Sequence, residues 1–261
     1  MTEISSLTNP GVKYVRRLQA ERRFRERERA FVVEGTRWLA EVVRLALPPG
    51  RVYYTATWAA RPEQAALLAQ LPEPAQPVSD AVMAAMSDTQ SPAGVLAVLP
   101  MPVHTRPEKV DFLLILDEIR IPGNLGTMLR TAAAAGVDAV LLSPGCVDAY
   151  NPKVVRGGMG AHLRLPVVAA SWPEIRQWVA GLHVWLAAAG GATAYTAVAW
   201  SKPSALIIGS EAVGAGSEAQ ALAPGRVAIP MHAATESLNA AVAAGILLFE
   251  AVRQRAQRPA P

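Results

Sequence analysis

Short apolar runs alternate with amphipathic stretches along most of this chain, and this alternation predicts strands and helices in turn. In the first hundred residues, helical patterns cover the basic stretch 12–29 and residues 38–45, 59–71 and 83–86. Between them, strands are expected at 31–33, 52–55 and 94–99. These elements are enough for one small α/β unit.

The pattern restarts at residues 112–116, a fully apolar run of the kind that is buried on both faces in a parallel sheet. Helices are expected near 125–135 and 238–253, and further strands at 139–142, 165–168, 184–187, 205–208 and 227–229. Strands that alternate with helices favour a parallel sheet with helices on both faces, so we predict an α/β fold. A composition of 51% hydrophobic and 18% charged residues excludes intrinsic disorder.

A stretch rich in proline and polar residues separates the two patterns and is the best linker candidate. It contains Pro100, Pro102 and Pro107. We therefore predict a smaller domain over residues 1–100, a linker over 101–110 and a larger domain over 111–261.

The charge of the chain is unevenly distributed. The net charge is +4 over 261 residues, but residues 12–29 alone hold eight basic and three acidic side chains, a net +5. Such a local basic face indicates a polyanion partner, and a solvated helix face of mixed charge is the alternative.

Cysteine and histidine usage excludes several kinds of site. The single cysteine, Cys146, rules out an intrachain disulfide, fits a reducing compartment, and is interpreted as a small buried or loop thiol. The four histidines lack ligand spacing, so we expect no metal. Because no signal peptide or run long enough to span a bilayer is found, we expect a cytoplasmic protein without a membrane partner.

Three glycine-containing loops follow predicted strands of the larger domain, where open parallel sheets bind their ligands. The loops are residues 117–126, leading into a helix with Arg130; residues 209–216; and residues 229–231 followed by 235–239. Polar side chains converge on this edge of the sheet: Asn124, Arg130, Glu211, Ser237 and Asn239.

Each of these residues also has a purely structural interpretation. Asn124 could cap its helix, Glu211 its own turn, and Ser237 or Asn239 the last helix. A dinucleotide-binding site is disfavoured, because the first strand-to-helix turn lacks the Gly-x-Gly-x-x-Gly pattern.

At these loops the sequence resembles the SpoU (TrmH-like) branch of the SPOUT RNA methyltransferases, which transfer a methyl group from S-adenosylmethionine to a ribose 2′-hydroxyl. The matching motifs are 121–126 with Arg130, 209–211 with Gly214, and 229–231 with 237–239, joined by a similar stretch from 143 to 161. The resemblance implies a parallel sheet with a deep trefoil knot, a homodimer, and no metal. It also implies cofactor contacts at Gly209, Glu211, Gly214, Ile229, Met231 and Leu238.

The resemblance further implies a catalytic set of Arg130, Asn124, Glu211, Ser237 and Asn239. The family's arginine is proposed to act in deprotonating the ribose hydroxyl. A protonated guanidinium has a pKa above about 12 and no acceptor, however, so electrostatic stabilisation of phosphate and alkoxide is the other role open to Arg130.

The first hundred residues resemble the substrate-binding domain attached to many of these enzymes, whose fold is like that of certain RNA-binding ribosomal proteins. The resemblance rests on Asn9 and Pro10, the basic helix, 31–35, 87–89 and 92–95, with Ala93 where relatives often carry glutamine. Candidate RNA-binding residues are Lys13, Arg16, Arg17, Arg22, Arg23, Arg25 and Arg156. Large-subunit ribosomal RNA is the first substrate hypothesis; transfer RNA and a non-catalytic RNA-binding or ribosome-assembly role are the alternatives.

Overall fold

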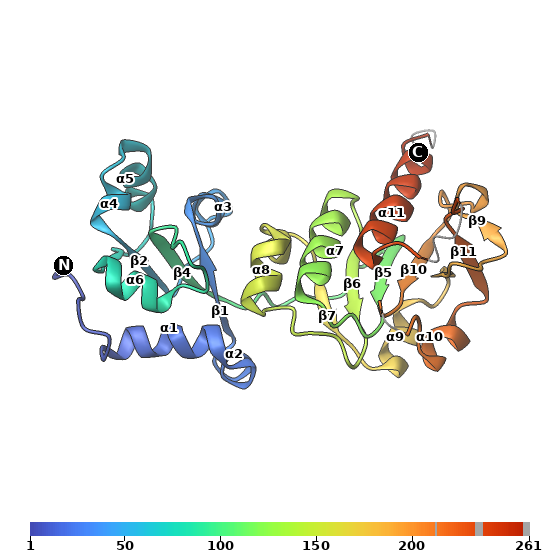
Figure 1. Ribbon diagram of the computed structural model, residues 1–261. Coiled ribbons are helices and arrows are strands. Elements are labelled where there is room, and N and C mark those ends of the chain that lie inside the picture. Colours follow the sequence, from blue (N-terminus) through green and yellow to red (C-terminus); the bar gives the residue numbers. More distant parts are fainter. Residues whose placement is uncertain (212, 233–236, 258–261) are drawn as a thin grey trace. The chain divides into compact units, whose positions relative to one another are not determined.

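The computed structural model describes residues 1–211, 213–232 and 237–257. Residue 212 of the second predicted loop and residues 235–236 of the third lie outside the described residues. The chain forms two compact units, each with its own sheet (Figure 1). The N-terminal unit comprises residues 1–102 and 150–160, and the C-terminal unit comprises 103–149 and 161–261.

The N-terminal unit is built on a four-stranded sheet in the order β1-β4-β2-β3. Its elements are α1 (Pro10–Ala20), α2 (Arg22–Glu28), β1 (Ala30–Glu34), α3 (Thr36–Arg44), β2 (Arg51–Tyr54), α4 (Ala56–Ala59), α5 (Pro62–Ala69), β3 (Gln76–Pro77), α6 (Asp80–Met86), β4 (Val95–Pro100) and α8 (Pro152–Gly158). The predicted small α/β unit is present, and most of its sheet is antiparallel, because β4 lies between β1 and β2 and runs antiparallel to both.

The basic stretch forms two helices rather than one. The chain leaves the helical conformation at Glu21, which has φ −111° and ψ 110°. The guanidinium of Arg25 then donates to the carbonyls of Leu18 and Gln19 at the end of α1. These bonds satisfy carbonyls that a helix end leaves without partners, so the break is stabilised from within α2.

Residues 150–160 pack with the N-terminal unit, although the sequence pattern places them in the stretch 111–261. The ring of Tyr150 lies 5.0 Å from that of Phe31, and Arg156 forms an ion pair of 2.9 Å with Asp88. Val154 and Val155 of α8 are buried as well, and α8 packs against β1, so this segment belongs to the N-terminal unit.

The C-terminal unit is built on a seven-stranded sheet in the order β7-β6-β5-β10-β8-β11-β9, in which neighbouring strands are parallel. Its elements are β5 (Phe112–Leu116), α7 (Pro122–Ala134), β6 (Ala139–Leu142), η1 (Ala161–Leu163), β7 (Val167–Ala169), α9 (Trp172–Trp178), β8 (His183–Ala187), β9 (Thr193–Ala194), η2 (Tyr195–Ala197), β10 (Ser204–Ile208), α10 (Ser217–Leu222), β11 (Gly225–Ala228) and α11 (Ala240–Ala256). The predicted α/β class with a parallel sheet is confirmed here.

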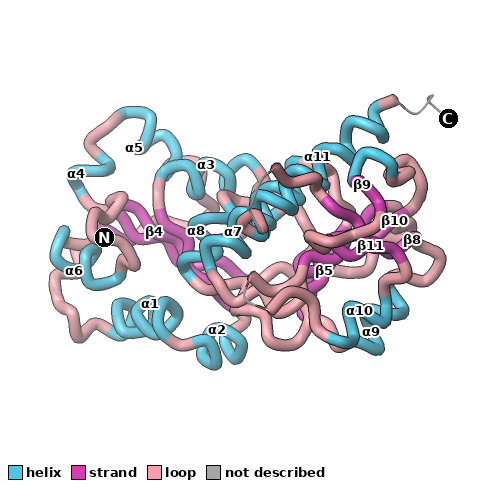
Figure 2. Tube along the Cα trace, turned by 45° about the vertical axis from the view of Figure 1, so that its right-hand side comes forward, coloured by secondary structure: helices cyan, strands magenta, loops and turns pink. Residues whose placement is uncertain are grey.

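Helices cover both faces of this sheet (Figures 1 and 2). On one face, Ile175 of α9 and Ala219 of α10 pack with Ile115 and Ile207 of the central strands. On the other face lie α7 and α11, which pack against each other. Because the strands are parallel, their carboxyl ends share one edge, and the strand order reverses between β5 and β10, where open sheets of this kind bind ligands.

Candidate functional site

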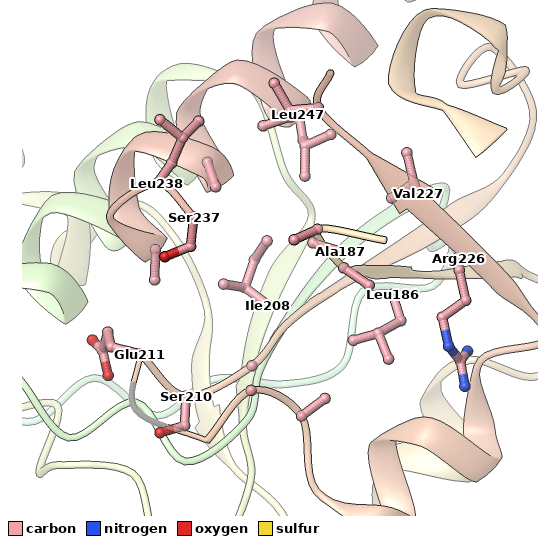
Figure 3. Close-up of a pocket in the computed structure, with 18 of the residues that line it drawn as sticks. Leu186, Ala187, Ile208, Ser210, Glu211, Arg226, Val227, Ser237, Leu238 and Leu247 are labelled. Atoms are coloured by element: carbon pink, nitrogen blue, oxygen red, sulfur yellow. The ribbon is translucent and has the colours of Figure 1, made fainter. Parts of the chain in front are cut away.

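A cavity of about 520 Å³ lies at the carboxyl ends of β8, β10 and β11 (Figure 3). Its wall is largely apolar, with side chains such as Leu186, Ile208 and Leu247. Polar groups are few, and two of them, Ser210 and Glu211, come from the loop after β10. A cavity of this size, apolar with a few polar groups at strand ends, is typical of small-molecule sites.

The loop 209–216 is folded tightly on itself. Ser210 and Gly214 exchange two backbone hydrogen bonds, of 3.0 and 2.9 Å. A Cβ atom on Gly209 would lie 2.5 Å from the backbone nitrogen of Ala215, so only glycine fits there without movement of the backbone. Gly214 has φ +72°, a left-handed conformation that glycine adopts readily.

A chain of side-chain hydrogen bonds joins the three predicted loops. The amide nitrogen of Asn124 donates to Glu211 Oε1 over 2.7 Å. The amide nitrogen of Asn239 donates to Asn124 Oδ1 over 3.1 Å. Residues that are 115 positions apart in the sequence are thereby held at one place beside the cavity.

The helix-capping role that the sequence leaves open applies to Asn239 but not to Asn124. Asn124 lies within the first turn of α7, whose N-cap is Ile121, so it is not the cap. Asn239 is the N-cap of α11, and its Oδ1 accepts hydrogen bonds from Ala241 and Val242. Asn239 therefore serves the helix with its oxygen and the chain of hydrogen bonds with its nitrogen.

The two remaining predicted catalytic residues lie outside these contacts. Ser237 is exposed and lines the cavity. Arg130 is exposed on α7, and within the described part of the chain it forms no ion pair or hydrogen bond. The structure thus brings four of the five predicted catalytic residues to the cavity or its edge and leaves the guanidinium of Arg130 facing solvent.

All six predicted cofactor-contact residues line the same cavity: Gly209, Glu211, Gly214, Ile229, Met231 and Leu238. The sequence reasoning missed the opposite wall, which residues 186–189, Val227 and Leu247 provide. Alanines 187–189 carry no chemical signal of their own. Only the pairing of β8 between β10 and β11 shows that this strand end belongs to the site.

The predicted RNA-binding residues divide into exposed and buried groups. Lys13, Arg16, Arg17, Arg22, Arg23 and Arg156 are exposed. Arg25 is only 3% exposed and holds the end of α1, so it is removed from the residues that can meet a phosphate. Arg17 and Arg22 form surface ion pairs with Glu21 and Glu26, each one turn later in the sequence.

Other candidate chemistry is structural. The Sγ of Cys146 donates to the carbonyl of Leu116, and burial raises the pKa of this thiol to about 11, so it is not a reactive thiolate. Burial also lowers the pKa of His162 to about 4. Among the residues that the structure describes, no group of three His, Cys, Asp or Glu side chains could hold a metal. No helix in this part of the chain combines the length and apolarity needed to cross a bilayer.

Comparison with known families identifies both halves of the chain. Residues 111–249 match the SpoU rRNA Methylase family, and residues 9–97 match the MRM3-like substrate binding domain. The chain belongs to the SpoU rRNA Methylase family. The resemblance inferred from the three loops is therefore confirmed.

Several relatives in this family align with nearly the whole chain. The 23S rRNA (guanosine(2553)-2′-O)-methyltransferase RlmP of Bacillus subtilis is 31% identical, over 95% of this chain and 98% of its own length. The SpoU methyltransferase AviRb of Streptomyces viridochromogenes, solved with AdoMet, has a TM-score of 0.88 at 27% identity and covers 95% of this chain and 99% of its own. An AdoMet-bound rRNA methyltransferase from Sinorhizobium meliloti has a TM-score of 0.84 at 28% identity, with 97% of each chain covered.

Proposed function

We propose that this protein is an S-adenosylmethionine-dependent RNA 2′-O-ribose methyltransferase that acts on large-subunit ribosomal RNA. The observation that carries the proposal is the hydrogen-bonded chain from Glu211 through Asn124 to Asn239 at the edge of the cavity. Family membership supports the reaction class, and the 23S rRNA substrate in the name of RlmP supports the choice of RNA. A protein that only binds RNA has no need for such a set of loops around a small-molecule cavity.

The cavity fits S-adenosylmethionine. Its volume of about 520 Å³ lies within the range of roughly 300–1,000 Å³ of small-molecule sites. A Cβ on Gly209 would collide with the backbone of Gly214 and Ala215, so glycine at this position allows the tight loop that forms one wall of the cavity. We expect Gly209, Ile229 and Leu238 to hold the cofactor mainly through backbone and apolar contacts, with Glu211, Gly214 and Met231 beside them.

S-adenosylmethionine, when bound, would supply the methyl group that replaces the proton of the ribose hydroxyl. The chain's own residues orient the ribose, because much of the rate of such a transfer comes from positioning. Glu211 is an acceptor that Asn124 fixes in place, and Ser237 adds a hydroxyl on the same side of the cavity. These groups can hold the ribose by hydrogen bonds.

Arg130 has the electrostatic role in this proposal. A protonated guanidinium has no acceptor, so it cannot take the hydroxyl proton, but it can bind the neighbouring phosphate and stabilise the alkoxide as charge develops. Its exposure and its lack of a carboxylate partner among the described residues leave it available for a phosphate.

The N-terminal unit, residues 1–100 in the predicted division, is proposed as the RNA-binding domain. The side chains of Lys13, Arg16 and Arg23 are exposed on α1 and α2. Such residues neutralise phosphates and give salt-dependent affinity that depends little on sequence, while the shape of a structured RNA supplies specificity.

We further propose that the protein is a homodimer. Val242 and Phe249 are 51% and 50% exposed and lie seven residues apart on α11, so they share one face of the helix. A second copy that packs on this face would bury both side chains. A trefoil knot in the C-terminal unit and a cytoplasmic location belong to the same proposal, on the strength of family membership.

Ribose-methylation mapping of total cellular RNA, with and without this protein, tests the function. We expect one ribose of large-subunit ribosomal RNA to lose its methyl group when the protein is absent. A lost methyl group in transfer RNA would instead establish the alternative substrate, and an unchanged map would favour a non-catalytic role. In vitro, Arg130→Ala is expected to keep S-adenosylmethionine binding by calorimetry and lose methyl transfer; undiminished transfer would refute the role of Arg130.

A further inference from the structure

Asp117 is a buried carboxylate at the carboxyl end of β5. It is not one of the predicted catalytic, cofactor-contact or RNA-binding residues. It is 2% exposed. Its backbone N–H donates to the carbonyl of Ile208 at the end of β10. This bond holds Asp117 at the point where the strand order reverses. Burying a carboxylate is costly unless hydrogen bonds compensate for the lost water, so its partners are informative.

The two carboxylate oxygens of Asp117 bind two different loops. Oδ1 accepts a hydrogen bond of 2.7 Å from the hydroxyl of Ser143, and Oδ2 accepts one of 2.8 Å from the backbone N–H of Gly216. Ser143 is itself 3% exposed and accepts a hydrogen bond from the N–H of Glu118. The hydroxyl of Ser143 therefore fixes one carboxylate oxygen, and the other oxygen fixes the backbone of Gly216.

Gly216 is the last residue of the loop that forms one wall of the cavity. Because Ser210 and Gly214 are closed on each other by two backbone hydrogen bonds, and Gly209 lies against Ala215, the loop 209–216 is a compact body. A displacement of Gly216 would consequently displace Glu211 and the glycines that face the cavity.

We propose that Asp117 is a positioning residue for S-adenosylmethionine binding, which fixes the loop 209–216 through Gly216 without touching the ligand. The inference rests on the proposed function. Charge-assisted hydrogen bonds are stronger and more directional than neutral ones, which suits a contact that must hold a loop in one place.

Asp117→Asn is the decisive substitution, because it keeps the shape of the side chain. With the amide nitrogen towards Ser143, it can donate to the hydroxyl oxygen, but the bond from Gly216 becomes a weaker, neutral one; in the opposite orientation the bond from Gly216 is lost. We expect the Kd and KM for S-adenosylmethionine to rise about tenfold, while kcat at saturating cofactor stays within about threefold. Hydrogen exchange in the peptide that covers residues 209–216 should become faster.

Asp138→Asn is the matched control. Asp138 Oδ2 accepts hydrogen bonds of 2.7 and 2.8 Å from the N–H groups of Asp111 and Phe112, at the opposite end of β5. The same charge is removed from the same unit, but away from the cavity. We expect unchanged cofactor affinity and unchanged exchange at 209–216, and a control that weakened binding as much as Asp117→Asn would overturn the inference.

Ser143→Ala keeps the proposal testable if Asp117→Asn does not fold. It removes one support of the carboxylate and leaves the bond to Gly216, so we expect about threefold weaker binding and faster exchange at 209–216. If wild type binds S-adenosylmethionine and the folded variants bind it equally well, the positioning role is wrong. If wild type does not bind it at all, the proposed function fails together with this inference.

Discussion

Gly209→Ala tests whether the tight fold of the loop 209–216 builds the cofactor site. The new Cβ would lie 2.5 and 2.7 Å from the backbone nitrogen and Cα of Ala215, and 2.6 Å from the carbonyl carbon of Gly214. Ordinary contact begins at 3.4 Å, so the two backbone segments must separate by about 0.9 Å. All three obstacles are backbone atoms, so no side chain can rotate away to make room.

The magnitude follows from the cost of overpacking, which is about 1–3 kcal/mol for an added methyl group in a packed site. In the ligand-free protein the loop escapes this strain by moving, and the cavity loses its shape. Binding must then restore the native loop against the same strain, so we expect a Kd for S-adenosylmethionine that is about 5- to 150-fold higher. The melting temperature should fall by less than about 4 °C, because the displaced loop leaves the sheet intact.

Isothermal titration calorimetry with S-adenosylmethionine measures this effect, and Gly190→Ala is the control. Gly190 is an exposed loop glycine of the same unit with no heavy atom within 4 Å of its would-be Cβ and without a left-handed φ. We expect the control to bind like wild type. Binding by Gly209→Ala within twofold of wild type would refute the reasoning.

Three further predictions concern other parts of the molecule. Asn124→Ala removes both bonds of the chain that joins the loops and should lower kcat by at least about tenfold, whereas Ser171→Ala, which breaks the capping box of α9, should leave kcat unchanged in the same methylation assay. The double variant Arg16→Ala, Arg23→Ala should weaken RNA binding and reduce the slope of log K against log[salt] by about 0.7–0.9 for each phosphate that is no longer neutralised; an unchanged slope in filter binding would contradict this. Burial raises the pKa of Cys146 to about 11, so its thiolate fraction at pH 8 is about a hundredfold below that of a thiol with pKa 9. Iodoacetamide should therefore label Cys146 slowly, and the labelling rate should rise about tenfold for each unit of increasing pH, which mass spectrometry can follow.

The sequence pattern located strand ends of the C-terminal unit, and it left the pairing of the N-terminal strands open. Glycines and polar side chains that directly follow apolar strands mark the carboxyl edge of a parallel sheet, and the six cofactor-contact residues that the family resemblance implied there all line one cavity. The strands 112–116 and 205–208 are apolar throughout, which requires burial on both faces and therefore a central position in the sheet.

Features that depend on pairing at long range were not predictable in this way. The antiparallel insertion of β4 between β1 and β2 follows from which strands meet, and alternation along the chain does not encode it. Arg25 is a clearer case: its neighbours in the basic stretch are exposed, and only the turn at Glu21 brings its guanidinium to the carbonyls of α1. From composition alone, such an arginine counts as a charge that can bind a phosphate. In the fold, its buried guanidinium is already hydrogen-bonded to backbone carbonyls.

The helix α7 carries two of the predicted catalytic residues and presents them differently. Asn124 and Arg130 are six residues apart, and at about 100° per residue they lie roughly 120° apart around the helix. The face of Asn124 is turned to Glu211 and Asn239, so it is occupied by the chain's own loops. The face of Arg130 meets no acceptor in the described part of the chain. A guanidinium held on a rigid helix in this way has no structural bond to give up, so its charge is available to an acceptor that arrives from outside, and an RNA phosphate is the acceptor whose geometry it fits.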